Sequence, residues 1–354
     1  MTERHICTKS AGFCHGGNVY EHPDAIDFSA NLNPLGMPEE IRTALHEAID
    51  RAETYPDPHC RELCAALAAH YGIPKSFVNC TSGASDALVR ICQVIRPAKA
   101  LVCAPCFSGY EKSLAAVGTR MARHILDMSN NFDVTEDFLD AITDDIELIF
   151  LCTPNNPTGR VVDLHIVEQV LERAIKVGAR LVLDESFLEF TEAPSAAPLL
   201  ERFENLVIVG SFTKLCCMAG VRLGYILCSD ERLREGFELV GADWAVSTAA
   251  QAAGLAALQL DTLASDTRAF VQARRAYLSE ELEVLGLRVI PGAANYLLVR
   301  SAKPLPEALA KKNILVRPCA DYHGLSERWM RIAVRTDEEN EQLIKAVKEV
   351  LNDC

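Results

Sequence analysis

Short runs of consecutive apolar residues alternate with amphipathic stretches through the first two thirds of the chain. Such runs occupy residues 77–83, 100–105 and 146–154, and each precedes a stretch with helical spacing of its apolar residues. This alternation predicts strands joined by helices, and therefore a mostly parallel sheet. Two further runs, 179–186 and 205–214, have Val, Leu and Ile at adjacent positions, as expected for strands covered on both faces. An antiparallel neighbour is predicted at residues 223–229.

The pattern changes after about residue 240, where long helical stretches are followed by short strands. This change predicts a second, smaller α+β unit. The Asn-, Pro- and Gly-rich opening has few helix or strand signals, so an arm laid on the other units is expected there. We therefore predict an N-terminal arm at 1–40, a large domain at 41–240 and a small domain at 241–354. The short strands of the last unit are expected at 295–300, 314–319 and 329–335, with a final helix at 336–351.

Composition narrows the classes of function. The chain has 354 residues, of which 49% are hydrophobic and 24% are charged, which is typical of a globular protein with a large core. A formal net charge of -14 argues against nucleic acid or an anionic membrane as a partner. The opening has no sustained apolar region, and no run is long enough to cross a bilayer, so a cytoplasmic location is expected.

The fourteen cysteines lie mostly in predicted core segments, where cysteine behaves as a small hydrophobic residue, so reduced thiols are expected. Cys103 and Cys106 form a CxxC motif, which can act as a redox pair or as half of a metal site. No second CxxC completes a four-cysteine zinc site, and the pair ends a predicted strand. A structural role is therefore favoured over a redox role, and no metal site is predicted.

Polar residues follow several predicted strands, and ligands of open parallel sheets lie at these carboxyl ends. Ser82, Gly83, Ala84 and Ser85 link a strand to a helix, where free backbone N–H groups can bind an anion, although the same segment also fits an ordinary helix start. Phe107 can stack on a flat heterocycle or pack in the core. The turn at 153–159 reads TPNNPTG, and its asparagine amides can donate to a ring oxygen.

Asp184 and Lys214 are two further candidate residues, each at the end of a predicted strand. Asp184 ends a buried strand, where a carboxylate needs a partner such as a protonated pyridine nitrogen. A single lysine is usually a solvated surface charge, but Lys214 follows Ser211 by three residues and precedes Arg222 by eight. A lysine amine condenses with an aldehyde, while a hydroxyl and a guanidinium hold a phosphate. The order of these residues predicts a site for pyridoxal 5'-phosphate (PLP).

The strings PNNPTG, LVLDES and SFTK with AGVRLGY resemble those of the fold-type I PLP enzymes, the aspartate aminotransferase superfamily, over essentially the whole chain. The resemblance implies an α/β fold whose large domain has a mostly parallel seven-stranded sheet between helices, beside a smaller α+β domain. It makes Lys214 the residue that bonds to the cofactor, Asp184 the partner of the pyridine nitrogen and Asn156 a donor to the ring hydroxyl oxygen. It implies phosphate contacts from Gly83, Ala84, Ser85, Ser211 and Arg222, and stacking by Phe107.

Three further features of the resemblance concern assembly and departures from the family. Tyr55 resembles a tyrosine that reaches the cofactor phosphate of the neighbouring subunit, which implies a homodimer. Many relatives have tyrosine three residues after the aspartate, whereas this chain has Phe187, so that hydrogen bond to the ring oxygen should be absent. The segment after the lysine, LCCMAG, also lacks a proline that is often present there.

Within the superfamily, the segments HGGN at 15–18 and DFSANLNPLGMP at 27–38 resemble the L-threonine-O-3-phosphate decarboxylases of cobalamin biosynthesis. The nearest alternative is histidinol-phosphate aminotransferase, and L-serine O-phosphate is an alternative substrate. A non-enzymatic sensing module is a third possibility. The resemblance implies a phosphorylated amino-acid substrate. Its carboxylate would be held by Arg331, its phosphate by Arg317, His15 and Asn31, and Asn156 would contact it as well.

Two of these assignments have structural alternatives. His15 and Asn31 can instead form hydrogen bonds that stabilise a loop. Arg335 ends the predicted strand that contains Arg331, and a solvent-exposed charge is the expected role for it. The Cα bond that breaks is the one held perpendicular to the cofactor ring, so the carboxylate and phosphate contacts are expected to decide between decarboxylation and transamination.

Overall fold

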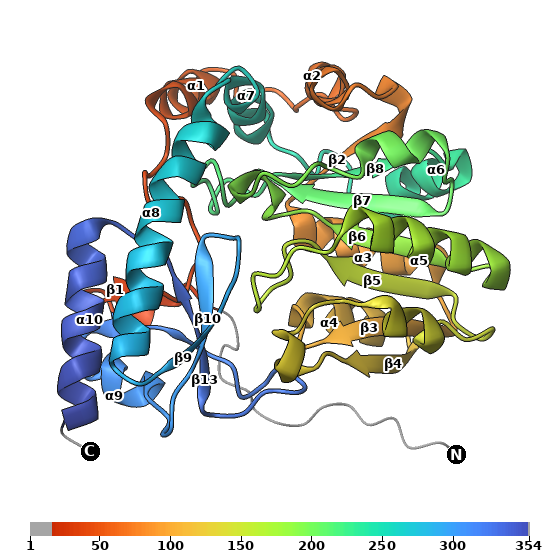
Figure 1. The fold of residues 1–354 in the computed structure, drawn as a ribbon. Coiled ribbons are helices and arrows are strands. Elements are labelled where there is room, and N and C mark those ends of the chain that lie inside the picture. The colour runs from red at the N-terminus through yellow and green to blue at the C-terminus, as the bar shows by residue number, and fades with distance from the viewer. Residues whose placement is uncertain (1–15, 353–354) are drawn as a thin grey trace, which may run out of the picture.

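A seven-stranded mixed sheet forms the centre of the computed structural model, which describes residues 16–352 (Figure 1). The strand order is β2-β8-β7-β6-β5-β3-β4; β8 is antiparallel to both of its neighbours, and the other pairings are parallel. The predicted α/β fold with a mostly parallel sheet is confirmed, including the antiparallel strand. The strands are β2 (Val78–Thr81), β3 (Lys99–Ala104), β4 (Arg120–Ile125), β5 (Leu148–Cys152), β6 (Arg180–Asp184), β7 (Leu206–Ser211) and β8 (Gly224–Cys228).

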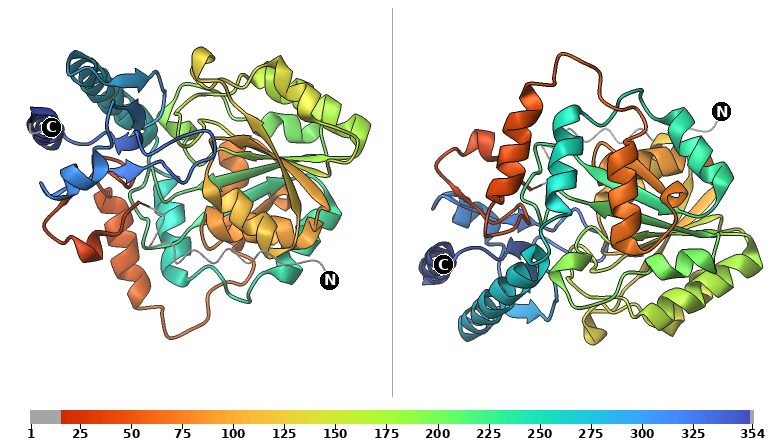
Figure 2. Two further views of the ribbon diagram at one scale, coloured as in Figure 1. Left: turned by 90° about the horizontal axis from the view of Figure 1, so that it is seen from below. Right: turned by 90° about the horizontal axis from the view of Figure 1, so that it is seen from above.

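Helices cover both faces of this sheet (Figures 1 and 2). Side chains alternate across a strand, so Val182 of β6 belongs to one core while Leu181 and Leu183 belong to the other. Leu88 of α3 lies in the first core and Val170 of α5 lies in the second. Burial on both faces explains why these strands have consecutive apolar residues. The helices around the sheet are α2 (Arg61–Tyr71), α3 (Ala84–Ile95), α4 (Ser108–Ala116), α5 (Leu164–Val177) and α6 (Glu231–Val240).

A second sheet is antiparallel and has the order β12-β13-β10-β9. Helix α8 packs on β9, β10 and α10, and α7 packs on α1. Strand β1 pairs with β11, so residues 26–27 join the C-terminal unit. We propose a division into an arm, a large domain and a small domain; the β1–β11 pairing supports the arm, and the packing of α7 on α1 joins the two domains. The elements are β1 (Ile26–Asp27), α1 (Glu39–Ile49), α7 (Thr248–Ala257), α8 (Leu263–Val284), β9 (Arg288–Ile290), β10 (Tyr296–Arg300), α9 (Pro306–Ala310), β11 (Ile314–Leu315), β12 (Arg317–Pro318), β13 (Trp329–Ala333) and α10 (Asp337–Asn352).

Two local differences from the sequence prediction have physical reasons. The strand expected at 314–319 is divided into β11 and β12, because its first residues pair with β1 and its later ones with β13. Strand β4 was not predicted, since it lies at the edge of the large sheet and its partly exposed residues form no apolar run.

Short 3-10 helices connect several of these elements. Within residues 16–352, no helix has both the length and the hydrophobicity required to cross a membrane. These short helices are η1 (Val19–Glu21), η2 (Lys75–Phe77), η3 (Met128–Asn130), η4 (Glu136–Ala141), η5 (Leu188–Phe190) and η6 (Ala197–Glu201).

Candidate active site

A cavity of about 250 Å³ lies at the carboxyl ends of the central strands. Cys152, Asp184 and Ser211 enter it from β5, β6 and β7, and Arg317 and Arg331 enter it from the second sheet. The cavity thus joins parts of the chain that are more than a hundred residues apart. The predicted site residues that line it are Asn31, Ala84, Ser85, Phe107, Asn156, Asp184, Ser211, Lys214, Arg222, Arg317 and Arg331.

Lys214 follows β7 in a turn, where its carbonyl oxygen accepts a hydrogen bond of 3.0 Å from the backbone N–H of Asn33. The pKa of Lys214 is lowered to about 8, chiefly by burial and then by the charges of Arg331 and Arg222, while the charge of Asp184 opposes the shift. About half of the amine is therefore neutral at pH 8. A neutral amine is the form that attacks an aldehyde, so the pocket prepares Lys214 for that bond.

Asp184 is held in a fixed orientation by two donors. The hydroxyl of Tyr110 donates to its Oδ2 at 2.7 Å, and the backbone N–H of Ser186 donates to its Oδ1 at 2.9 Å. The residue is only 4% exposed. The sequence did not identify Tyr110 as a site residue. Its spacing from Phe107 places the two residues on one side of the start of α4, and their rings pack edge to edge.

The start of α3 forms the anion-binding end of the cavity. A Cβ on Gly83 would lie 2.5 Å from Nη2 of Arg222, and a Cβ on Gly224 would lie 2.6 Å from the backbone nitrogen of Ala84. Glycine at both positions allows the helix start to approach the guanidinium and β8. Unpaired N–H groups of a first helical turn together with an arginine fit a phosphate.

The opposite side of the cavity contains two arginines from adjacent strands. Arg317 of β12 and Arg331 of β13 are directly paired in register. Arg331 donates from Nη1 to Oδ1 of Asn156 at 2.6 Å and from Nη2 to the carbonyl oxygen of Ser29 at 2.8 Å. Arg317 donates to Asp321 at 2.6 Å. These bonds fix both guanidinium groups before any ligand arrives.

Asn31 is buried, with an exposed fraction of 2%, and lines the same cavity. Neither its Oδ1 nor its Nδ2 has a hydrogen-bond partner within the described part of the chain. An unpaired buried amide is costly, so this side chain fits a polar ligand better than a role in stabilising a loop. Asn155, by contrast, is used structurally, because its Nδ2 donates to Pro105 and Thr158.

Other predicted residues lie elsewhere or act indirectly. Tyr55 is 78% exposed and stacks on Trp244 with ring centroids 4.4 Å apart, outside this cavity. Gly83 lies beside the cavity, and His15 lies outside the described residues. The expectation of an exposed charge at Arg335 is wrong, since this partly buried side chain donates to the backbone carbonyl oxygen of Asp27 and pairs with the carboxylate of Glu339 at 2.7 Å.

Several lining residues were not identified from the sequence, although Ser29, Ser186 and Thr213 lie within the segments DFSANLNPLGMP, LVLDES and SFTK. Phe187 lies in the cavity without a hydroxyl group, and its ring packs edge-on against Tyr296. Burial raises the pKa of Cys103 and Cys106. Among residues 16–352, no three His, Cys, Asp or Glu residues are arranged to hold a metal. The lining residues not identified from the sequence are Gly16, Ser29, Ala30, Tyr110, Cys152, Ser186, Thr213 and Tyr322.

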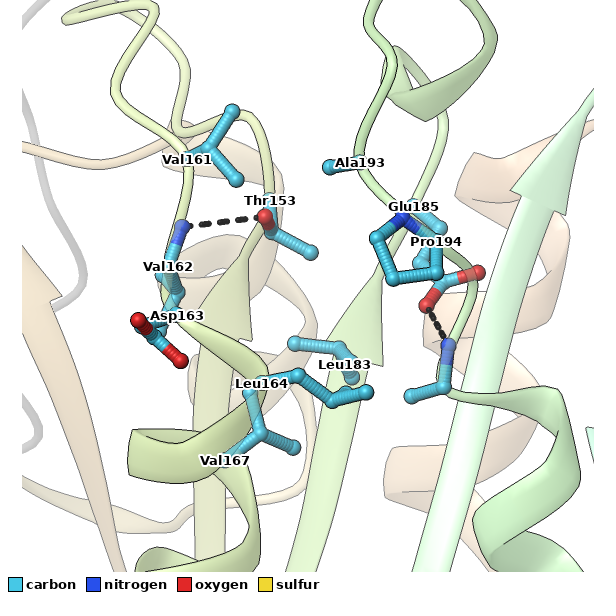
Figure 3. A pocket seen from close by; sticks show the side chains of 11 residues that line it. Thr153, Val161, Val162, Asp163, Leu164, Val167, Leu183, Glu185, Ala193 and Pro194 are labelled. Atoms are coloured by element: carbon cyan, nitrogen blue, oxygen red, sulfur yellow. Dashed lines mark hydrogen bonds between the residues drawn. The ribbon is translucent and has the colours of Figure 1, made fainter.

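A second cavity, of about 300 Å³, lies beside Glu185 (Figure 3). Glu185 follows Asp184 directly and points away from the first cavity. Its carboxylate accepts hydrogen bonds from the hydroxyl of Ser195 at 2.6 Å and the backbone N–H of Ala196 at 2.8 Å. Burial raises the pKa of Glu185 to about 7.

Replacing Glu185 with glutamine is expected to stabilise the protein at alkaline pH. Because folding raises the pKa of Glu185, its neutral form stabilises the fold below pH 4.5, and this contribution is lost as the pH rises through 7. Glutamine keeps the neutral state, so the variant should gain up to about 3 kcal/mol over the parent protein at pH 8 and little at pH 5. Urea unfolding at both values tests this, and equal stability differences at both would contradict it.

The fold and the first cavity define a PLP-dependent enzyme, with an amine, a carboxylate and a phosphate cradle in one pocket. The chain belongs to the aminotransferase class I and II family, which matches residues 23–347, and its cofactor is PLP. It is 34% identical to the threonine-phosphate decarboxylase of Salmonella typhimurium, over 95% of this chain and 96% of the relative.

Two further comparisons give the range of similar proteins. The chain is 32% identical to a histidinol-phosphate aminotransferase of Nitratidesulfovibrio vulgaris, over 93% of this chain and 89% of the relative. The crystal structure of L-threonine-O-3-phosphate decarboxylase from Porphyromonas gingivalis is similar with a TM-score of 0.83 and 25% identity, over 92% and 99% of the two chains. Family membership therefore leaves two reactions to be distinguished.

Proposed function

We propose that this protein decarboxylates L-threonine O-3-phosphate to (R)-1-amino-2-propanol O-phosphate. The direct pairing of Arg317 with Arg331 is the observation that carries the proposal. Side chains of directly paired residues lie on one face of a sheet, about 5 Å apart at Cβ, so two guanidinium groups face the cavity together. This arrangement suits a small substrate with two anionic groups close to each other.

L-Threonine O-3-phosphate has this distribution of charge, because its carboxylate and its phosphate ester lie on neighbouring carbons. Histidinol phosphate has a phosphate but no carboxylate. We infer that Arg331 binds the carboxylate, and that Arg317 and Asn31 bind the phosphate. Asn31 supports this assignment because its amide is buried in the cavity without a hydrogen-bond partner among residues 16–352.

The cofactor would be held by residues already placed around the cavity. Lys214 would bond to its aldehyde, Asp184 would pair with its ring nitrogen, and the start of α3 with Ser211 and Arg222 would bind its phosphate. When bound, PLP accepts the electron pair of the Cα bond that stands perpendicular to its ring. The two arginines would set which bond takes that position, and Lys214 Nζ would deliver the proton that replaces the lost carboxylate at Cα.

A homodimer is part of the proposal. Tyr55 does not line the cavity of its own chain, and its exposed ring suits a contact with the cofactor phosphate of a second copy. By its resemblance to the decarboxylases, the enzyme would act in the nucleotide-loop arm of cobalamin biosynthesis.

Histidinol-phosphate aminotransferase is the second candidate, favoured by the 32% identity to such an enzyme and by the same pair of arginines, which would also fit a dicarboxylate amino donor. A product assay separates the candidates. Purified protein with PLP is given L-threonine O-phosphate, L-serine O-phosphate, or histidinol phosphate with 2-oxoglutarate. We expect carbon dioxide from the first, and slower release from the second, because one methyl group contributes about 1–3 kcal/mol of discrimination. Glutamate formation from histidinol phosphate without carbon dioxide release would overturn the proposal.

A further inference from the structure

Three cysteines from two adjacent elements meet beside the strand that leads to the phosphate end of the cavity. Cys60 immediately precedes α2, Cys64 lies in its first turn, and Cys80 lies in β2. The sulfur atoms of Cys64 and Cys80 are 3.6 Å apart. Sixteen positions separate the two residues in the chain, so no sequence motif identifies the pair.

The two thiols differ in acidity. The hydrogen bond between the two thiols lowers the pKa of Cys64, and the charge of Lys75 acts in the same direction, while burial and Asp57 oppose it. Hydrogen bonds to Cys60 and Cys64, together with burial, raise the pKa of Cys80 well above its usual value. Cys64 is therefore the more acidic of the two thiols, and it is the one expected to attack an oxidant first. The thiolate is the form that reacts with peroxides and disulfides.

A small cavity gives access to this pair. It has a volume of about 130 Å³, and Cys60, Cys64 and Cys80 all line it, together with His59. A water molecule occupies about 30 Å³ in the liquid, so a hydroperoxide group fits in this space. The CxxC pair differs, since burial raises the pKa of both Cys103 and Cys106.

We propose that Cys64 and Cys80 form a redox site. Hydrogen peroxide oxidises the two thiols to a Cys64–Cys80 disulfide, and this oxidation is reversible. The Cys64 thiolate attacks a peroxide oxygen, which forms an S–O bond and breaks the O–O bond, and the first water leaves after protonation. The sulfur of Cys80 then attacks Cys64, so that the S–S bond forms, the S–O bond breaks and a second water leaves. The two thiols together lose two electrons, and one hydrogen peroxide is reduced to two waters.

The Cys64–Cys80 disulfide would displace the segment at the phosphate end of the cavity. A disulfide is about 2.05 Å long, so the two sulfur atoms must approach by about 1.5 Å. Strand β2 ends one residue after Cys80, and Gly83, Ala84 and Ser85 follow within five residues. Oxidation therefore displaces the segment that would hold the cofactor phosphate, and we expect faster release of PLP. This second part rests on the proposed cofactor site.

The site is tested on the PLP-loaded protein treated with hydrogen peroxide. We expect a mass loss of about 2 Da, recovered with dithiothreitol, and a linked peptide pair containing Cys64 and Cys80 in a non-reducing digest. The Cys64→Ser and Cys80→Ser variants should lose this link, whereas Cys103→Ser should keep it. Linkage through Cys60 or within the CxxC motif, or unlinked peptides in the parent protein, would overturn the proposal.

Cofactor release supplies the second readout. After dilution, the absorbance of bound PLP should decay severalfold faster in the oxidised parent protein than in the reduced one. Cys80→Ser should show equal rates with and without peroxide. A Cys64–Cys80 link with an unchanged release rate would refute the coupling to the phosphate end. A failed decarboxylase assay would leave the peptide map unaffected, so the two proposals can fail separately.

Discussion

Replacing Lys214 with alanine is expected to remove the covalent attachment of PLP and to reduce turnover by on the order of 10³-fold or more. The turn after β7 places this amine in the cavity beside Asp184 and Arg222, and burial together with nearby arginines lowers its pKa to about 8. No other described lysine lines this cavity. The absorbance of the lysine-bound cofactor should disappear, and borohydride should no longer trap a cofactor adduct on residues 206–228.

Lys112→Ala is the matched control, because this lysine is exposed on α4 and does not line the cavity. Its absorbance, adduct and turnover should equal those of the parent protein. A cofactor adduct that persists in Lys214→Ala would show that another lysine carries PLP. Noncovalent PLP in the same variant is compatible with the prediction, since the phosphate contacts at the start of α3 remain.

Replacing Arg331 with glutamine is expected to cause a large fall in kcat/KM. This guanidinium is buried and already bonded to Asn156 and Ser29, and its Nε has no partner among the described residues. Removing one member of a buried charged pair costs about 2–5 kcal/mol. We therefore expect kcat/KM for L-threonine O-phosphate to fall about 30-fold to 5,000-fold, measured by release of carbon dioxide, while PLP remains bound.

Arg335→Gln supplies the comparison for this substitution. Arg335 lies four residues further along and bonds to Asp27 and Glu339, outside the cavity. Its variant should lose stability but keep kcat/KM within a few-fold of the parent value. If kcat/KM fell equally in the two variants, the cause would be a shared structural effect, and Arg331 would be rejected as the carboxylate ligand.

Much of the cofactor end of the cavity was predictable because it depends on residues that directly follow strands. Asp184, Ser211 and Lys214 come at or just after the ends of β6 and β7, and parallel strands bring their carboxyl ends to one edge. The role of Tyr110 was not predictable, since its bond to Asp184 joins residues 74 positions apart. The division of 314–319 into two strands was also missed, because it depends on partners from both ends of the chain.

The sequence by itself determined the fold class and the order of the cofactor residues. Apolar periodicity and turn residues are local properties, and both can be read along the chain. Only the tertiary structure decided which distant side chains meet: Arg317 with Arg331, and Cys64 with Cys80. The physical reason is that strand register and helix packing, which no short segment specifies alone, fix these contacts. The cofactor site therefore follows from local order, and the proposed substrate and redox sites follow from packing.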